Sequence, residues 1–415
     1  MQRFLKVRAL DCPKPPSADV LGRSQALNPP VLPKVEDPLR FGILGAARIG
    51  PDALFTPAKT HPGVVVTAVA CRDKARGDKY ANKHKVEKVF AGQTCYQGRC
   101  HLLDDKDVDA VYIPLPNGLH FEWTMRAIDA GKHVLVEKPI TNTADEARAI
   151  FARAAQKGVV VLEAVHFTFH PATQRVREIV ASGELGKIKS AKAWFTVPTL
   201  MGPFIWEKND IRYDFDLGGG STMDQGVYPL TAIRYFTGTD EVLPEVTFAK
   251  AIGMPSDAKR VDRAMHAAFK LPSPLGAEAA GEALTGETIC DFSDPGWGPF
   301  GLFPHMPKFN AEVTLEGGKV EYFNFIVPAL YHSITVRPSK GEARTERVYV
   351  SKDGYGEPYW STYRYQLEAF VDKVRGRTPQ YWPTPETTIT KMECVEMIYE
   401  KAEMPPRPAS SYKAP

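Results

Sequence analysis

Short runs of consecutive apolar residues recur through the N-terminal part of the chain, and charged, helix-type segments separate them. Each run has the length and the β-branched content of a buried strand. The predicted strands cover residues 39–45, 64–73, 109–116, 132–138 and 159–167. Strands that are apolar throughout and alternate with helices are typical of a parallel sheet covered on both faces.

Helices are predicted between these strands. Charged residues over 74–85 indicate one helix. An apolar face that follows Asn117 indicates a second helix, and Asn117 is expected to be its N-cap. Thr143 and Glu146 have the spacing of a capping box, which predicts the start of a third helix.

The pattern changes in the C-terminal part of the chain. A helix is expected from Pro171 to about Ser182, and the strand-and-turn pattern over 244–350 predicts an antiparallel sheet. The segment 271–300 is rich in Gly, Pro, Ala and Glu and is expected to be a long loop or insertion. Two helical stretches close the chain, at 361–376 and 385–403.

The charge balance and the apolar stretches exclude several partners. The chain has 52 basic and 49 acidic residues and a net charge of +3, so a nucleic-acid partner is not indicated. The longest strongly apolar stretch, residues 64–70, is too short to span a bilayer, and a membrane partner is not expected. The N-terminus lacks the apolar core of a secretory signal.

The six cysteines are scattered along the chain. Only Cys95 and Cys100 lie near each other, and neither has a His or Cys partner at the spacing of a zinc site. We therefore expect free thiols, no metal and a cytoplasmic location.

A glycine motif follows directly on the first predicted strand. The sequence GAARIG fits the dinucleotide fingerprint, with Gly45 for the tight turn, Ala47 at the second glycine position and Gly50 for helix–sheet packing. The N-terminus of the following helix would present N–H groups to phosphate. Such a motif between a strand and a helix predicts dinucleotide binding, and a plain strand-to-helix turn is the alternative.

The end of the second strand bears on the choice of cofactor. An acidic residue here would hold the ribose hydroxyls of NAD, and Asp73 leaves that option open. Arg72 precedes it, and an arginine at this position can grip a 2′-phosphate through two hydrogen bonds. The sequence therefore favours NADP over NAD.

These patterns together predict an α/β protein. A doubly wound parallel sheet of Rossmann type comes first, and a C-terminal α+β domain with a largely antiparallel sheet follows. The predicted divisions are a Pro-rich arm laid on the body or left loose (1–38), a dinucleotide-binding domain (39–165), a substrate and oligomerisation domain (166–360) and C-terminal helices with a tail (361–415).

Lys138 ends the fourth predicted strand, between Glu137 and Pro139, at the sheet edge where ligands bind. Downstream, Asp224 and Tyr228 are four residues apart after three glycines, so one helical face would carry both. A nearby ammonium can lower the pKa of a phenol by about 1–3 units. Lys138, Tyr228 and Asp224 are thus candidates for charge stabilisation, proton transfer and substrate orientation, and ordinary packing roles are the alternative.

Five segments resemble one family, in order and at suitable spacings over residues 39–403. They are GILGAARIG (42–50), LPNGLH (115–120), EKP (137–139), EA…FHP (163–171) and GGGSTMDQGVY (218–228). Together they resemble the glucose–fructose oxidoreductase / inositol dehydrogenase / MocA family. Within it the chain is most similar to the branch of NADP-dependent D-xylose 1-dehydrogenases and dimeric dihydrodiol dehydrogenases.

The resemblance implies roles for particular residues. Lys138 would be the catalytic lysine with a cis bond to Pro139, and Tyr228 the acid/base. The second domain would have an open sheet that forms a homodimer, and the last helices would return to the first domain. Together with Arg72, the expected cofactor-binding residues are Gly45, Ala47, Arg48, Ile49, Arg72, Leu115, Asn117, His120, Glu137 and Lys138.

The expected reaction is hydride transfer between NADP and a C–OH or C=O group of a small sugar, polyol or diol, such as D-xylose oxidised to its lactone. Phe167, Asp224 and Tyr228 are the expected substrate contacts. Related sequences often carry an arginine where this chain has Thr168, which leaves the substrate open. Tyr363 and nearby aromatic residues are expected to pack under the last helices, or to face a sugar.

Three alternatives remain at this point. One is a trans-dihydrodiol dehydrogenase or a carbonyl reductase of secondary metabolism. The second, from another class, is a non-catalytic regulator that senses NADP, although loss of Lys138 or Tyr228 would be its expected signature. The third is an NAD-dependent glycosidase, for which no supporting cluster of His, Cys and Asp is present in the sequence.

Overall fold

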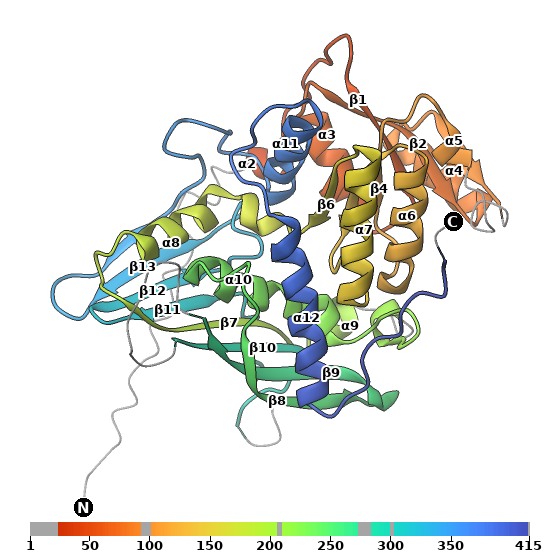
Figure 1. Cartoon of the computed structure of the whole chain (residues 1–415). Helices are drawn as coiled ribbons and strands as arrows, with labels where there is room; N and C mark the ends of the chain where they lie inside the picture. The colour runs from red at the N-terminus through yellow and green to blue at the C-terminus, as the bar shows by residue number, and fades with distance from the viewer. Residues whose placement is uncertain (1–23, 93–100, 206–209, 273–283, 299–302, 414–415) are drawn as a thin grey trace, which may run out of the picture.

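Two β-sheets organise the computed structural model of the chain, which describes residues 24–92, 101–205, 210–272, 284–298 and 303–413. A six-stranded sheet is built from the N-terminal part, and an eight-stranded sheet from the C-terminal part. Helices lie against both sheets, and the last long helix passes between them (Figure 1).

The first sheet is parallel throughout, with the order β3-β2-β1-β4-β5-β6 of a doubly wound fold. Its strands are β1 (Leu39–Leu44), β2 (Val64–Cys71), β3 (Lys88–Ala91), β4 (Ala110–Ile113), β5 (His133–Glu137) and β6 (Val161–Ala164). All five predicted strands are confirmed. The short β3 was not predicted, so the strand that ends before Lys138 is the fifth in the chain.

The helices of this half connect successive strands. They are α3 (Thr56–Lys59), α4 (Lys74–His84), α5 (His101–Asp104), α6 (His120–Asp129) and α7 (Ala144–Lys157). The capping box of Thr143 and Glu146 at the start of α7 is confirmed. The prediction that Asn117 caps α6 is wrong, because Asn117 lies in the 3-10 turn η3 (Asn117–Leu119) and its side-chain amide donates to the Gly218 carbonyl.

The second sheet has the order β14-β13-β12-β11-β7-β10-β9-β8. Its strands are β7 (Ile188–Pro198), β8 (Glu245–Met254), β9 (Asp257–Leu271), β10 (Leu284–Asp294), β11 (Ala311–Leu315), β12 (Gly318–Phe323), β13 (Ser333–Pro338) and β14 (Arg344–Glu346). Only the β7–β10 pair is parallel among these described strands, so the largely antiparallel prediction is confirmed. The helices of this half are α8 (Pro171–Ala181), α9 (Gly202–Ile205) and α10 (Val227–Thr237).

The predicted loop at 271–300 is wrong over much of its length. β10 occupies 284–294 as an inner strand between β7 and β9. Its side chains alternate between buried and less buried positions from Leu284 to Cys290, a period that the surrounding Gly- and Glu-rich composition obscured. The remaining parts, 273–283 and 299–300, lie outside the described residues.

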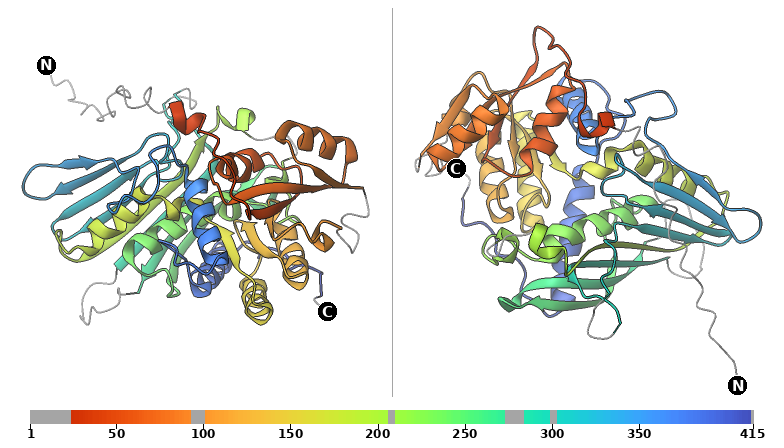
Figure 2. Two further views of the ribbon diagram at one scale, coloured as in Figure 1. Left: turned by 90° about the horizontal axis from the view of Figure 1, so that it is seen from above. Right: turned by 180° about the vertical axis from the view of Figure 1, so that it is seen from behind.

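The two predicted C-terminal helices are confirmed as α11 (Thr362–Val374) and α12 (Pro385–Lys401). The last helices return to the first sheet, because the ring of Phe370 in α11 lies 5.6 Å from that of Phe41 in β1. α12 contacts both α7 of the first half and β8 of the second (Figure 2). This helix therefore joins the two halves.

The described part of the N-terminal arm lies on the body. The Leu32 N–H donates to the Lys59 carbonyl at 3.0 Å, and the Val35 N–H donates to the Pro62 carbonyl at 3.1 Å. A short helix, α2 (Ser24–Leu27), precedes this stretch and was not predicted. Residues 1–23 of the predicted arm lie outside the described residues.

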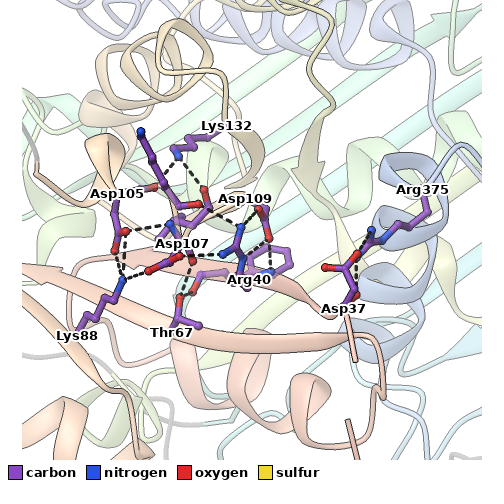
Figure 3. Close-up of polar contacts among 12 residues, drawn as sticks. Asp37, Arg40, Thr67, Lys88, Asp105, Asp107, Asp109, Lys132 and Arg375 are labelled. Atoms are coloured by element: carbon purple, nitrogen blue, oxygen red, sulfur yellow. Dashed lines mark hydrogen bonds and ion pairs between the residues drawn. The ribbon is translucent and has the colours of Figure 1, made fainter. Parts of the chain in front are cut away.

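Charged residues join the amino ends of the first sheet (Figure 3). Arg40 of β1 donates to both carboxylate oxygens of Asp109, at 2.9 and 2.7 Å. Lys88 of β3 pairs with Asp105 and Asp107, and Lys132 donates to two backbone carbonyls. These contacts brace one edge of the sheet and leave the carboxyl edge to the predicted chemical residues.

Of the six cysteines, Cys71, Cys290 and Cys394 lie within the described residues, and all three are buried and free. Cys12, Cys95 and Cys100 lie outside them. Over the described ranges, no helix combines the length and the apolar character that crossing a bilayer requires.

Candidate active site

Three loops meet at the carboxyl edge of the first sheet. They follow β1, β4 and β5 and carry the glycine turn, the 115–120 segment and Lys138. His120 connects two of them, because its ring nitrogens lie 2.7 Å from the Pro139 carbonyl and 2.7 Å from the Leu115 carbonyl. Leu115 also lies against Gly45, where an added Cβ would come within 3.3 Å of its side chain. The predicted cofactor and catalytic segments are therefore contiguous.

The glycine turn has the conformation that its motif predicts. Gly45 has φ +104°, a value that residues with a Cβ rarely adopt. Tyr80 of α4 supports the turn by donating from its hydroxyl to the Ala47 carbonyl at 3.0 Å. In the part of the chain that the structure describes, the backbone N–H groups of Ala47 and Ile49 have no hydrogen-bond partner. Free N–H groups at such a turn fit a bound phosphate.

The end of β2 has two arginines and one acid. Arg72 is exposed, while the Asp73 carboxylate accepts the Arg76 N–H at 2.7 Å and so caps α4. The Arg76 guanidinium donates to the Ala46 carbonyl at 2.9 Å, next to the glycine turn. Sequence reasoning missed Arg76, although its place in the first turn of the helix after Arg72 was a usable signal. These side chains suit a phosphate beside the ribose better than a free ribose.

Lys138 and Asp224 form the centre of the site. The Lys138–Pro139 peptide is cis, as the resemblance implied. The Lys138 ammonium donates to the carboxylate Oδ1 of Asp224 at 2.7 Å and to the Asp224 carbonyl at 2.6 Å. Their side chains are 11% and 18% exposed, so this ion pair lies at the boundary between core and solvent. Two of the predicted catalytic residues are therefore in direct contact.

Arg212 is a site residue that sequence reasoning missed. Its Nε donates to Oδ2 of Asp224 at 2.8 Å, and its Nη1 donates to Asp210 at 3.0 Å. Burial alone would raise the pKa of Asp224, but Arg212 and Lys138 together lower it well below the ordinary value. Asp224 is thus an anion held between two cations. Arg212 lies in an irregular segment, where no periodicity could indicate it.

Tyr228 lies on the other side of Lys138. The ammonium is 5.1 Å from the centroid of the Tyr228 ring, so Asp224 and Tyr228 share a face as the i, i+4 spacing predicted. Asp224 occupies the π-helical turn η6 (Thr222–Gly226), which continues into α10. The Tyr228 hydroxyl lies 3.2 Å from Nε2 of His166, whose Nδ1 lies 2.8 Å from the Thr362 hydroxyl. His166 was not predicted as a site residue.

The prediction that Lys138 lowers the pKa of Tyr228 is wrong for this structure. Burial raises the pKa of Tyr228 well above its ordinary value. The ammonium faces the ring rather than the hydroxyl and is neutralised by Asp224. Burial, and then the charge of Lys138, lower the pKa of His166 to about 3. At neutral pH, Tyr228 is therefore a phenol and His166 is uncharged.

The remaining predicted residues surround this centre. Glu137 accepts a hydrogen bond from the Tyr112 hydroxyl at 2.6 Å, and burial raises the pKa of its carboxyl. Phe167 is fully buried, with its ring 6.0 Å from that of Tyr228, so it supports Tyr228 and its contact with substrate stays a prediction. The ring of Tyr363 lies 4.1 Å from that of His166 and thus borders the site. Trp360, by contrast, packs under the last helices as expected, 5.1 Å from Tyr365.

Two family models match most of the described halves. The model of an oxidoreductase family with an NAD-binding Rossmann fold, GFO/IDH/MocA, matches residues 39–165. The model of the GFO/IDH/MocA C-terminal domain matches residues 173–284.

Curated relatives are sugar enzymes. The chain is 34% identical to D-xylose 1-dehydrogenase (NADP(+)) 2 of Haloferax volcanii over 88% of this chain and 98% of that protein. It is 38% identical to dTDP-3,4-didehydro-2,6-dideoxy-alpha-D-glucose 3-reductase of Actinomadura kijaniata over 50% of this chain and 59% of that protein.

A solved structure has the same overall arrangement. The 3-ketoreductase KijD10 of Actinomadura kijaniata, crystallised with NADP and TDP-benzene, matches with a TM-score of 0.70 and 27% identity. The match covers 88% of this chain and 98% of that one. The similarity therefore extends over both sheets.

Proposed function

Because the chain belongs to the GFO/IDH/MocA oxidoreductase family, we propose that it transfers hydride between NADP and a C–OH or C=O group of an aldose. The observation that carries this proposal is the contact of Lys138 with Asp224 and Tyr228, beside the glycine turn. The proposed catalytic residues are thus Lys138, Asp224 and Tyr228.

NADP rather than NAD is the proposed cofactor. Asp73 is committed to capping α4, which removes the acid that would hold the ribose hydroxyls of NAD. Arg72 and Arg76 supply two guanidinium groups for a 2′-phosphate. A named relative is NADP-dependent, and KijD10 was crystallised with NADP. When bound, NADP supplies the acceptor or donor of hydride.

The proposed roles follow from the contacts. Lys138 has three N–H donors, of which two are given to Asp224, and the third would hold the substrate oxygen. In oxidation, the substrate hydroxyl proton passes to the Tyr228 hydroxyl oxygen while the phenol proton passes to Nε2 of His166. In reduction, the phenol donates its proton to the developing alkoxide, and the high pKa of Tyr228 keeps that proton available.

D-xylose, oxidised to its lactone, is the proposed substrate, because the relative that covers most of this chain is a D-xylose 1-dehydrogenase. A second candidate is reduction of a keto-sugar, which the relatives named as 3-reductases favour. The chain spans about three fifths of the length of those reductases, so their activity has less support here. A trans-dihydrodiol dehydrogenase, or a carbonyl reductase of secondary metabolism, has no named relative among these matches.

We propose a division of labour in which residues 39–165 bind the cofactor and 166–360 bind substrate and form a homodimer. Large apolar side chains on β8, Phe248 and Ile252, are 42% and 49% exposed and would be covered in a dimer. A cytoplasmic location fits the three described cysteines, which are free thiols. Light scattering of the wild type and of Ile252→Asp tests the dimer.

A panel of aldoses, polyols, vicinal diols and keto-sugars, assayed at 340 nm with NADP(H) and NAD(H), tests the proposed function. We expect turnover of D-xylose with NADP that falls sharply in Lys138→Ala, because that variant loses the ammonium that holds the substrate oxygen. Tight NADP binding without turnover of any compound would favour the competing class, a regulator that senses NADP.

A further inference from the structure

The C-terminal tail, residues 404–412, crosses from the second sheet to the helices of the first (Figure 1). We propose that Arg407 in this tail is a positioning residue: with Asp262 it holds the turn that carries Asp224 against Lys138. The proposal rests on the catalytic role proposed for Lys138 and Asp224. It assigns the tail a part in the reaction that no motif in the sequence indicated.

Arg407 and Asp262 form a fully buried ion pair. Both side chains have 0% exposure, and Nη2 of Arg407 lies 2.8 Å from Oδ1 of Asp262. The guanidinium also donates to the carbonyls of Gly219 and Arg260 and lies over the ring of Tyr399, 4.1 Å from its centroid. A buried charge with this many partners has one allowed position.

Asp262 passes this constraint to the turn η6. Its Oδ2 accepts three hydrogen bonds, from the Ser221 hydroxyl at 2.8 Å and from the Thr222 N–H and hydroxyl at 2.7 Å each. Thr222 is the first residue of η6, and Asp224 lies two residues further on. The anchored acid therefore fixes the start of the turn from which the Asp224 side chain projects.

The glycine segment before η6 is fixed by the same pair and bears the other partner of Asp224. The Gly219 carbonyl accepts from Arg407, and the Gly220 N–H donates to the Arg212 carbonyl at 2.8 Å. The Gly220 carbonyl in turn accepts the Asp224 N–H at 3.0 Å. Both the backbone of Arg212 and that of Asp224 thus hang on residues that the buried ion pair holds.

This packing leaves no room for side chains at the glycines. A Cβ on Gly220, whose φ is +122°, would lie 2.2 Å from Oδ1 of Asp262 and 2.6 Å from Nη2 of Arg407. A Cβ on Gly219 would lie 2.6 Å from the Arg212 carbonyl oxygen. The successive glycines are therefore explained by the approach of the tail arginine, and not only by a flexible turn.

The tail is attached to the first half as well. The Asn142 side chain donates to the Pro408 carbonyl at 2.8 Å, and the Ser410 N–H donates to Glu146 at 2.6 Å. Tyr412 lies under the Arg126 guanidinium of α6, at 4.7 Å from the ring centroid. Asn142 follows Lys138 by four residues. The tail thus links the segment after Lys138 to the turn before Asp224.

Arg407→Lys is the informative substitution. Lysine keeps a positive charge beside Asp262, so the buried acid stays paired and the protein folds. It lacks the planar fork that reaches the Gly219 and Arg260 carbonyls at the same time. Arg375→Lys is the matched control, because Arg375 pairs with Asp37, whose side chain is 86% exposed, at the amino edge of the first sheet.

Hydrogen exchange without substrate and steady-state kinetics test the proposal in the full chain. For Arg407→Lys we expect exchange over 217–228 to accelerate about tenfold, and that over α7 to stay unchanged. We expect kcat to fall about ten- to a hundredfold, with the Kd for NADP within about twofold of the wild-type value. Arg375→Lys should change none of these.

A double substitution separates positioning from general destabilisation. In an Asp224→Ala background, Arg407→Lys should cause no further loss of kcat, because the residue it positions is already absent. Unchanged exchange over 217–228, or an equal further loss of kcat in that background, would overturn the proposal. Because exchange is measured without substrate, a wrong assignment of the reaction leaves that result intact, and full activity of Lys138→Ala would identify that separate failure.

Discussion

His166 makes the stability of the protein depend on pH, since its ring is buried against Tyr228 and Lys138. Burial, followed by the Lys138 charge, lowers its pKa from 6.5 to about 3. Between these values the unfolded chain binds a proton that the folded chain does not. The contribution of His166 to stability is therefore complete above the unfolded pKa and is lost as the pH falls towards the folded one.

The magnitude follows from the two pKa values. At pH 7 the unfolded histidine is largely neutral, and at pH 5 it is largely protonated while the folded one is not. Acidification from pH 7 to pH 5 should therefore cost about 2 kcal/mol of unfolding free energy through His166 alone. A difference of this size is easily resolved, because single-domain stabilities are only about 5–15 kcal/mol.

The assay is urea unfolding at pH 7 and pH 5, followed by tryptophan fluorescence, for the wild type and His166→Gln. Glutamine does not titrate and can still hydrogen-bond, so the variant should lose about 2 kcal/mol less than the wild type on acidification. His101→Gln, at a side chain with 63% exposure, is the control. An unchanged pH dependence in His166→Gln would refute the burial of a neutral imidazole at the site.

Three further predictions concern the site. Arg76→Ala should raise KM for NADP about tenfold or more with little change for NAD, since it loses a charge-assisted contact, and equal losses would contradict a 2′-phosphate site. Tyr228→Phe should lower kcat about 10²- to 10⁴-fold in steady-state assays, and retained turnover would exclude the phenol from proton transfer. Asp224→Ala should lower the unfolding free energy by about 1–3 kcal/mol in urea titrations, because Lys138 and Arg212 lose their shared counter-charge and solvent compensates in part, and unchanged stability would show that the pair contributes nothing.

Local sequence signals predicted the scaffold and the centre of the site. The apolar strands of the first sheet are buried on both faces, which makes their pattern unambiguous. Lys138 was found because an acid, a base and a proline end such a strand, and Asp224 with Tyr228 because helical spacing places them together. In each case the signal lies within a few residues of the feature.

The residues that were missed act through contacts between distant segments. Arg212 lies in an irregular segment and Arg407 in a Pro-containing tail, and only the folded chain brings them to Asp224 and Gly219. The effect of Lys138 on Tyr228 was predicted wrongly because the spacing could not show that Asp224 occupies the ammonium first. Sequence patterns identify which groups are present, whereas the partner that each group selects depends on tertiary packing.

The most direct measurement follows deuterium from D-xylose labelled at C1 into NADP, with mass spectrometry of the reduced cofactor. The account predicts deuterated NADPH from the wild type and almost none from Lys138→Ala, although that variant still binds NADP. NADPH without deuterium, or equal labelling by Lys138→Ala, would contradict hydride transfer at the Lys138 site.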